Sequence, residues 1–163
     1  ILSSHYHCLS TNGNFNNHIG VPLTLLRITG KEHFVVVEMG ANHAREIDEL
    51  CQWAFPNSGV ITNIGRAHLE GFGSFQNIID TKLALYQNIH RNLGTIFVNA
   101  DDALLMEKVP QATLVKYSTK SPADVMVELM PSDGNLKFYW NNHLVQTQLF
   151  GEYNLYNAAA AIP

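Results

Sequence analysis

A carboxylate, Glu38, stands directly after an apolar run of strand-like residues. Val35, Val36 and Val37 favour an extended strand that is built for a core. A buried carboxylate without a partner is costly, so Glu38 either pairs with another group or faces a ligand at the strand end. His68 follows the next predicted strand, and a carboxylate and an imidazole at neighbouring strand ends could ligate a divalent cation. The alternative is a Glu38 that simply faces solvent.

Lys82 is a second candidate, because it lies within the apolar stripe of a predicted helix. Ile78, Ile79, Leu85 and Tyr86 are three or four residues away from it in the sequence. A partly buried lysine has a lowered pKa and can carry out covalent chemistry. The alternative is a lysine whose stem packs on the stripe while its ammonium group reaches water.

Two segments are rich in side-chain amides. The loop from Thr11 to Pro22 precedes a helix that has Pro22 in its first turn, and its amides and backbone N–H groups suit a polar or phosphorylated ligand. Asn154 and Asn157 lie three residues apart at the start of a small-residue helix. The alternatives are a well-capped loop in the first case and an asparagine helix cap in the second.

The elements that must position these residues alternate along the chain. Predicted strands at 34–38, 59–62, 95–99 and 113–117 are separated by predicted helices at 46–54, from Ser74 to about 89, and at 103–107. This alternation predicts an α/β fold with a mostly parallel sheet and crossover helices. Beyond Pro122, alternating runs between turn sequences predict a small antiparallel β meander packed on the α/β part, followed by a helix from about Asn154.

Both ends of the chain resemble elements that are cut short, so we expect a fragment of a longer protein. We expect an α/β part at about 1–121 and 151–163, and an antiparallel β part at about 122–150. With 163 residues and 46% hydrophobic content, the chain can bury a core.

Composition excludes several classes of function. A net charge of −4 without a basic stripe makes nucleic acid a poor partner. No apolar run approaches a membrane span and no signal peptide begins the sequence, so we expect a cytoplasmic protein without a membrane partner. Cys8 and Cys51 stand in unlike contexts and are predicted to be free thiols, and the histidines lack the spacing of a structural zinc site.

Five blocks, taken in order, resemble the Mur ligases, the ATP-dependent amide-forming enzymes of bacterial cell-wall precursor synthesis. The blocks are G-N-F-N-N-H-I-G-V-P-L-T-L-L (13–26), V-V-E-M-G-A-N-H (36–43), G-V-I-T-N-I-G-R-A-H-L-E-G-F-G-S (59–74), T-K-L-A-L-Y (81–86) and G-E-Y-N-L-Y-N-A-A-A-A (151–161). Within the family they are most similar to the branch that adds D-alanyl-D-alanine to UDP-N-acetylmuramoyl-tripeptide, and less so to the related folate-polyglutamate ligases. The resemblance implies the central ATPase domain, with a fold like that of P-loop NTPases.

The resemblance also implies a role for each candidate. Glu38 would match the family's magnesium-binding glutamate, and His68 the histidine that holds a second magnesium. Lys82 would match a lysine that carbon dioxide carbamoylates, whose new carboxylate supports that second magnesium. Asn157, together with Asn154, would match the asparagine that reads the adenine of ATP.

A substrate loop and one departure from the family pattern complete this assignment. The 11–17 loop would lie against the UDP-muramoyl-peptide, and the contact residues implied are Thr11, Asn14, Asn16 and Asn17. The usual His-Asn pair of the last block reads Tyr153-Asn154 here, which leaves any contact from position 153 open.

The implied reaction transfers the γ-phosphoryl group of ATP to the substrate's terminal carboxylate, and the amine of D-alanyl-D-alanine then attacks the acyl phosphate. The family's phosphate loop, N-terminal UDP-binding domain and C-terminal domain are absent from this sequence. We therefore expect an incomplete central domain that is inactive alone and belongs to a monomeric bacterial enzyme. A non-catalytic nucleotide or sugar-nucleotide binding remnant and a generic metal-dependent hydrolase remain as alternatives.

Overall fold

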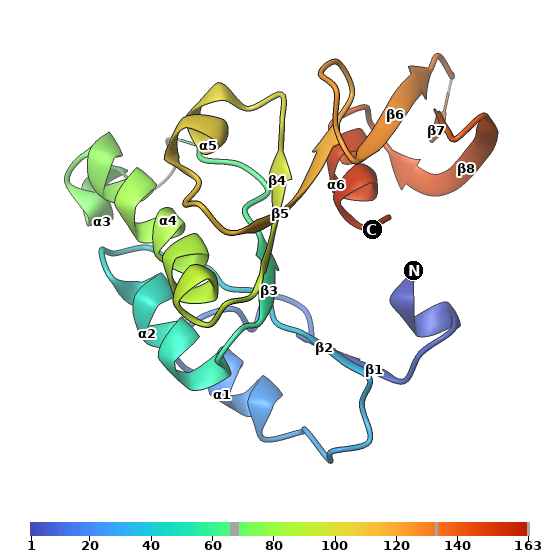
Figure 1. Ribbon diagram of the computed structural model, residues 1–163. Helices are drawn as coiled ribbons and strands as arrows, with labels where there is room; N and C mark the ends of the chain where they lie inside the picture. Colours follow the sequence, from blue (N-terminus) through green and yellow to red (C-terminus); the bar gives the residue numbers. More distant parts are fainter. Residues whose placement is uncertain (66–68, 133, 163) are drawn as a thin grey trace. The chain divides into compact units, whose positions relative to one another are not determined.

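The computed structural model describes residues 1–65, 69–132 and 134–162. It divides into two compact units (Figure 1). The first consists of Ile1–Pro56 and Ile64–Asn88, and the second of Asn57–Asn63 and Ile89–Pro163. None of the helices in the described ranges is long and apolar enough to cross a membrane.

The first unit contains a two-stranded parallel sheet and a group of helices. Its elements are the 3-10 helix η1 (Leu2–Ser4), β1 (Cys8–Ser10), α1 (Gly20–Leu25), β2 (Phe34–Val36), α2 (Glu46–Ala54), α3 (Leu69–Phe72) and most of α4 (Phe75–Arg91). β1 pairs with β2 in a register that sets Cys8 opposite Phe34. β2 is shorter than the predicted 34–38, because Glu38 donates its backbone N–H to a side chain instead of to a strand.

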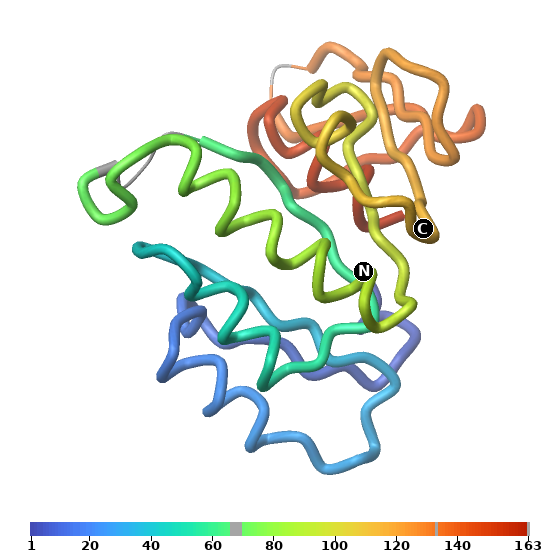
Figure 2. Tube along the Cα trace, turned by 60° about the vertical axis from the view of Figure 1, so that its left-hand side comes forward, coloured from blue at the N-terminus to red at the C-terminus, as the bar shows by residue number. Residues whose placement is uncertain are grey.

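The helices α1, α2 and α4 of the first unit lie side by side (Figures 1 and 2). Val21 of α1, Leu50 of α2 and Ala84 of α4 are buried in one apolar cluster, and Val37 and Met39 pack against it. The two residues that flank Glu38 are therefore anchored in a core, while the carboxylate between them points out of it. This anchoring fixes the backbone from which Glu38 projects.

The valine run itself is less buried than its sequence predicts. Phe34, Val35 and Val36 are 41%, 37% and 49% exposed. Among the described residues β2 has a single strand partner, β1, so much of its surface is left uncovered. The run is thus a strand with an anchored end, not a central core strand of this unit.

α4 begins after Ser74, as predicted. Ser74 Oγ accepts a hydrogen bond of 3.1 Å from the backbone N–H of Asn77, which is the bond of a helix N-cap. Ile78 and Tyr86 are 1% and 0% exposed on the inner face of α4. Lys82 lies between them and is half-buried, as its place in the apolar stripe predicts.

The second unit contains a six-stranded sheet in the order β3-β4-β5-β6-β7-β8. Its elements are β3 (Ser58–Val60), β4 (Thr95–Asn99), α5 (Ala103–Lys108), β5 (Thr113–Ser118), β6 (Val125–Met130), β7 (Asn135–Trp140), β8 (His143–Phe150) and α6 (Asn154–Ala160). The strands from β3 to β6 are parallel, and those from β6 to β8 are antiparallel. The predicted α/β fold with a mostly parallel sheet and an antiparallel part is confirmed.

The antiparallel strands continue the sheet instead of packing on it as a separate layer. β5 and β6 overlap only where Tyr117 faces Val125 and Ser118 faces Met126, so β6 extends the sheet past the end of β5. One face of the extension is covered by α6, whose Leu155, Ala158 and Ala159 are buried against the strands. The alternating burial of β6 and β7 reflects this single covered face.

Replacing Ser74 with alanine should lower the free energy of unfolding by about 1 kcal/mol, because the Asn77 N–H then loses its acceptor. Urea denaturation followed by far-ultraviolet circular dichroism measures the change. Ser3 is a matched control, since it is exposed and its side chain makes no hydrogen bond within the described residues. Equal stability of the Ser74→Ala and Ser3→Ala variants would show that the cap contributes nothing.

Candidate functional site

The segment that follows β2 is hydrogen-bonded to the loop that follows β1. Thr11 donates its backbone N–H to Val36 O at 3.1 Å, and the Thr11 hydroxyl accepts from the backbone N–H of Glu38 at 2.9 Å. Gly40 donates to Asn16 O at 2.8 Å. The carboxyl ends of the two parallel strands thus lead into polar segments that run beside each other, which is where α/β sheets place their ligand sites.

Asn16 and Glu38 meet directly at this edge. Asn16 Nδ2 donates to Glu38 Oε1 at 2.7 Å, a short bond to a charged acceptor. Glu38 is exposed, and its second oxygen, Oε2, accepts no hydrogen bond from any residue the structure describes. The carboxylate is therefore oriented by one oxygen and open to solvent or a ligand through the other. Glu38 thus has a partner, Asn16, but it is exposed instead of buried, which agrees equally well with the alternative of a carboxylate that faces solvent.

Gly40 is required for this arrangement. A Cβ atom at position 40 would lie 2.8 Å from Asn16 Nδ2, the atom that binds Glu38. That distance is shorter than any ordinary contact, so a side chain at position 40 would displace the Asn16 amide. The glycine in the E-M-G sequence is explained by this close approach.

The other loop residues have different roles. Asn17 Oδ1 accepts from the backbone N–H groups of Ile19 and Gly20, at 3.1 and 2.9 Å, so this amide caps the approach to α1. The side chain of Asn14 is exposed. The alternative reading of a well-capped loop therefore describes Asn17, whereas Asn16 is turned toward Glu38.

A pocket of about 310 Å³ opens beside this pair in the first unit. Amides, imidazoles and one carboxylate line it, namely Asn16, Asn17, His18, Gly40, Ala41, Asn42, His43 and Glu46. The lining offers several hydrogen-bond donors and acceptors together with apolar surface. These donors and acceptors suit a ligand with polar groups.

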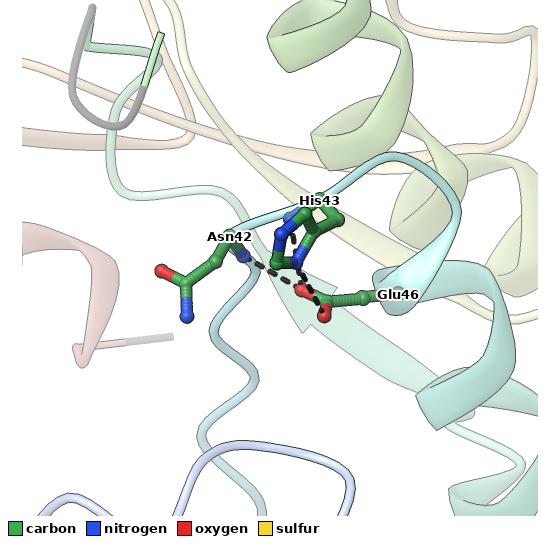
Figure 3. A network of polar contacts seen from close by, with 3 residues as sticks. All are labelled: Asn42, His43 and Glu46. Carbon is green, nitrogen blue, oxygen red and sulfur yellow. Dashed lines mark hydrogen bonds and ion pairs between the residues drawn. The ribbon is translucent and has the colours of Figure 1, made fainter. Parts of the chain in front are cut away.

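Glu46 orders one wall of the pocket (Figure 3). Its Oε2 accepts the backbone N–H groups of Asn42 and His43 at 2.6 and 3.1 Å, and its Oε1 lies 3.3 Å from His43 Nδ1. Burial alone would raise the pKa of Glu46, but these hydrogen bonds outweigh it and hold the pKa below its usual value. Arg45, the N-cap of α2, has a left-handed φ of 71° and makes no side-chain cap.

The sequence reasoning did not single out Glu46. Its signal was present as a glutamate at the first position of a predicted helix, three and four residues after His43 and Asn42. A glutamate there can reach back to free backbone N–H groups, as it does here.

Lys82 is half-buried on α4, and burial lowers the pKa of its amine. A lowered pKa enlarges the fraction of neutral, nucleophilic amine near neutral pH. Lys82 belongs to the same unit as Glu38. His68, the third residue of the predicted cation site, lies outside the described residues.

The described residues contain no group of three or more histidine, cysteine, aspartate or glutamate side chains that could hold a metal ion. Glu38 nevertheless has the right chemistry for one ligand, since a hard, exposed carboxylate oxygen suits Mg²⁺. Mg²⁺ is often held by one or two carboxylates together with water and phosphate oxygens. Cys8 and Cys51 are free thiols, as predicted, and burial raises the pKa of Cys51 to about 12.

Asn154 and Asn157 form a pair at the start of α6. Asn154 Nδ2 donates to Phe150 O at 2.7 Å, and Asn154 Oδ1 accepts from Asn157 Nδ2 at 3.0 Å. Asn157 is exposed, so its carboxamide keeps both a donor and an acceptor available. Neither asparagine caps the helix, because the N-cap is Tyr153 and makes no side-chain cap bond.

Comparison with known proteins decides the family. The family model for the Mur ligase middle domain matches residues 1–163. The chain belongs to the Mur ligase family. The family that the five sequence blocks resemble is thereby confirmed.

Several relatives are named as one type of Mur ligase. The UDP-N-acetylmuramoyl-tripeptide--D-alanyl-D-alanine ligase of Haemophilus influenzae is 50% identical over 93 residues, which cover 57% of this chain and 20% of that protein. The Bacillus subtilis enzyme of the same name is 32% identical over 165 residues, covering 99% of this chain and 36% of that protein. The crystal structure of the MurF ligase of Thermotoga maritima in complex with ADP has a TM-score of 0.79 and 29% identity, covering 98% of this chain and 38% of that chain.

The chain thus spans about a third of the length of the Bacillus relative that it matches from end to end.

In this Mur ligase domain, replacing Glu46 with glutamine should make the amides of Asn42 and His43 exchange roughly fivefold faster with solvent. Amide hydrogen exchange measured by NMR gives this rate. Glu49 is the control, since it is exposed on the same helix and its side chain makes no hydrogen bond among the described residues. Unchanged exchange in Glu46→Gln would mean that the wall is ordered by other contacts.

The protection of the Asn42 and His43 amides from exchange should also depend on pH. The pKa of Glu46 in the folded protein lies below its ordinary value of 4.5, so its stabilising contribution is complete well above that pH. The contribution is lost as the pH falls through the lowered pKa, and the wild-type protein then approaches the behaviour of Glu46→Gln.

Proposed function

We propose that the chain is the middle-domain part of an ATP-dependent ligase that joins D-alanyl-D-alanine to UDP-N-acetylmuramoyl-tripeptide in peptidoglycan precursor synthesis. One observation carries the proposal, namely Glu38, held through Oε1 by Asn16 and open through Oε2 at the end of β2. The names of the relatives, and the ADP in the Thermotoga structure, support the substrate and nucleotide. The D-alanyl-D-alanine, the muramoyl-tripeptide and ATP are the partners that this function requires.

The reaction has two steps. A carboxylate oxygen of the tripeptide attacks the γ-phosphorus of ATP, the bond to the β–γ bridging oxygen breaks, and ADP leaves. The amine of D-alanyl-D-alanine then attacks the acyl carbon, the phosphate leaves with the electrons of the C–O bond, and the amine loses a proton to form the amide. Negative charge increases on the phosphoryl oxygens in the first step and on the carbonyl oxygen in the second.

Glu38 is assigned to magnesium in this reaction. Magnesium, when bound, would offset the negative charge of the phosphoryl oxygens. The part of Glu38 is to present one carboxylate oxygen in a fixed direction, and Asn16 and Gly40 keep that direction. His68 is proposed as a further ligand on the resemblance of its sequence block.

Lys82 is assigned as a carbamoylated lysine. Its neutral amine would attack the carbon of carbon dioxide, form an N–C bond and release a proton to solvent, which leaves a carboxylate at the end of a long side chain. Half-burial and a lowered pKa favour the neutral amine that this step needs. The new carboxylate would support the second magnesium together with His68.

The remaining site residues are assigned to the two organic ligands. Thr11 and Asn16 order the 11–17 loop against the strand end, and the loop with Asn14 and Asn17 is proposed to contact the UDP-muramoyl-peptide. The polar pocket beside it suits such a ligand. On α6, the exposed carboxamide of Asn157 offers one donor and one acceptor, the pattern that can read the adenine of ATP, while Asn154 fixes its orientation.

In a full-length ligase that contains these residues, Glu38→Gln should lower kcat roughly 100-fold and raise the magnesium concentration that gives half-maximal activity. The glutamine keeps the size of the side chain but loses the charge. Steady-state kinetics over a magnesium titration measure both effects. Glu128→Gln is the control, because Glu128 is exposed on β6 in the second unit. Wild-type kinetics in Glu38→Gln would overturn the metal assignment.

Lys82→Ala should inactivate the same ligase, and short-chain carboxylic acids at high concentration should restore part of the activity by supplying the missing carboxylate. Lys31→Ala, which removes an exposed lysine, is the control and should be unaffected by the acids. A lysine that only packs its stem predicts a modest loss of stability and no rescue. Full activity of Lys82→Ala, or inactivity that no acid relieves, counts against the carbamate.

A further inference from the structure

A second carboxylate follows a strand end, in the second unit. Asp101 comes after β4, in the N-A-D-D sequence at 99–102, and the sequence reasoning gave it no role. Its Oδ1 accepts from Ser118 Oγ at 2.7 Å and from the backbone N–H of Ser121 at 3.1 Å. Its Oδ2 accepts from the backbone N–H and the hydroxyl of Thr119, at 2.7 and 3.0 Å. Asp101 thus ties the loop after β4 to the loop after β5.

The Asp101 carboxylate also contacts a residue of α6. Tyr156 of α6 places its hydroxyl 3.3 Å from Asp101 Oδ2 and 3.0 Å from Thr119 Oγ1. Burial alone would raise the pKa of Asp101, but the hydrogen bonds from Ser118, Thr119 and Ser121 outweigh it and hold the pKa well below its usual range. The Tyr156 hydroxyl therefore lies beside a carboxylate whose hydrogen bonds favour its ionised form.

This polar anchor supplies something that the apolar packing of α6 does not. The buried residues of α6 are Leu155, Ala158 and Ala159, and small alanine side chains leave the rotation of a helix weakly specified. α6 has only seven residues and no side-chain N-cap. A directional bond from Tyr156 to a fixed acceptor sets the angle at which the helix presents its exposed face.

Tyr156 stands immediately before Asn157 and two residues after Asn154, the pair assigned above to adenine. We propose that Tyr156, with Asp101 and Thr119 as its anchor, is a positioning residue that sets the rotation of α6 so that Asn157 meets the base of the nucleotide. The proposal rests on the function assigned to Asn157. The Tyr156 hydroxyl itself does not contact the nucleotide in this proposal. Its loss should still weaken ATP binding, because Asn157 is then no longer held in place.

The test is a double-mutant cycle in a full-length ligase that contains these residues. Tyr156→Phe should raise the KM for ATP roughly three- to tenfold, and Asn157→Ala should raise it at least as much. The KM values for the other two substrates and the kcat at saturating ATP should stay within about twofold of wild type. Because Tyr156 acts through Asn157, the double variant should bind ATP no more weakly than Asn157→Ala alone.

Two further variants sharpen the result. Thr119→Val removes the hydroxyl that bridges Tyr156 and Asp101 at nearly constant volume, so it should raise the KM for ATP in the same way even if Tyr156→Phe folds poorly. Tyr139→Phe removes an exposed hydroxyl on β7 that makes no hydrogen bond among the described residues, and it should leave the KM for ATP unchanged.

The outcomes distinguish the positioning role of Tyr156 from the adenine contact of Asn157. An unchanged KM for ATP in Tyr156→Phe and Thr119→Val would overturn the positioning role. So would a Tyr156→Phe effect on the KM that is as large in the Asn157→Ala background as in the wild type. Either result would leave the adenine contact standing. An unchanged KM in Asn157→Ala would overturn the adenine contact itself, and the positioning role with it.

Discussion

The hydrogen bond between Asn16 and Glu38 is the interaction on which the candidate site depends. It joins a loop to a strand end 22 residues away and uses one carboxylate oxygen, so that the other keeps a fixed direction and stays open. Its geometry requires a glycine at position 40 and a backbone anchored on both sides of Glu38 by Val37 and Met39. The apolar core of the first unit, the 11–17 loop and Gly40 therefore all help to position the Glu38 carboxylate.

Two carboxylates at strand ends show how their surroundings separate their roles. Asp101 accepts hydrogen bonds from the last residue of β5, from two residues of the loop that follows it and from a tyrosine, and both of its oxygens are used. Glu38 accepts one, and its oxygen Oε2 is unused by the described residues. A saturated carboxylate holds loops together, whereas an oriented but unsaturated one is available to a cation. The same residue chemistry thus gives a structural group in one unit and a candidate ligand in the other.

Sequence patterns predicted the features that depend on near neighbours. The helix at 46–54 and the strand at 95–99 have the predicted bounds, because apolar periodicity and a following proline or turn are local signals. The end of β2 was predicted two residues too late, since Glu38 leaves the strand to bond with Thr11, a residue distant in the sequence. The continuation of the sheet through β6 likewise depends on a pairing across a short overlap that no local pattern specifies. The bond between Tyr156 and Asp101 spans 55 residues and has no signal in either segment.

The most direct measurement is the binding of Mn²⁺, as a paramagnetic substitute for Mg²⁺, to a full-length ligase in the presence of ATP, followed by electron paramagnetic resonance. If Asn16 orients Glu38 toward the cation, Asn16→Ala should weaken Mn²⁺ binding roughly tenfold while the protein stays folded. Asn12→Ala, which changes an exposed amide of the same loop, should leave it as in the wild type. Equal Mn²⁺ affinity in the wild type and Asn16→Ala would contradict the account.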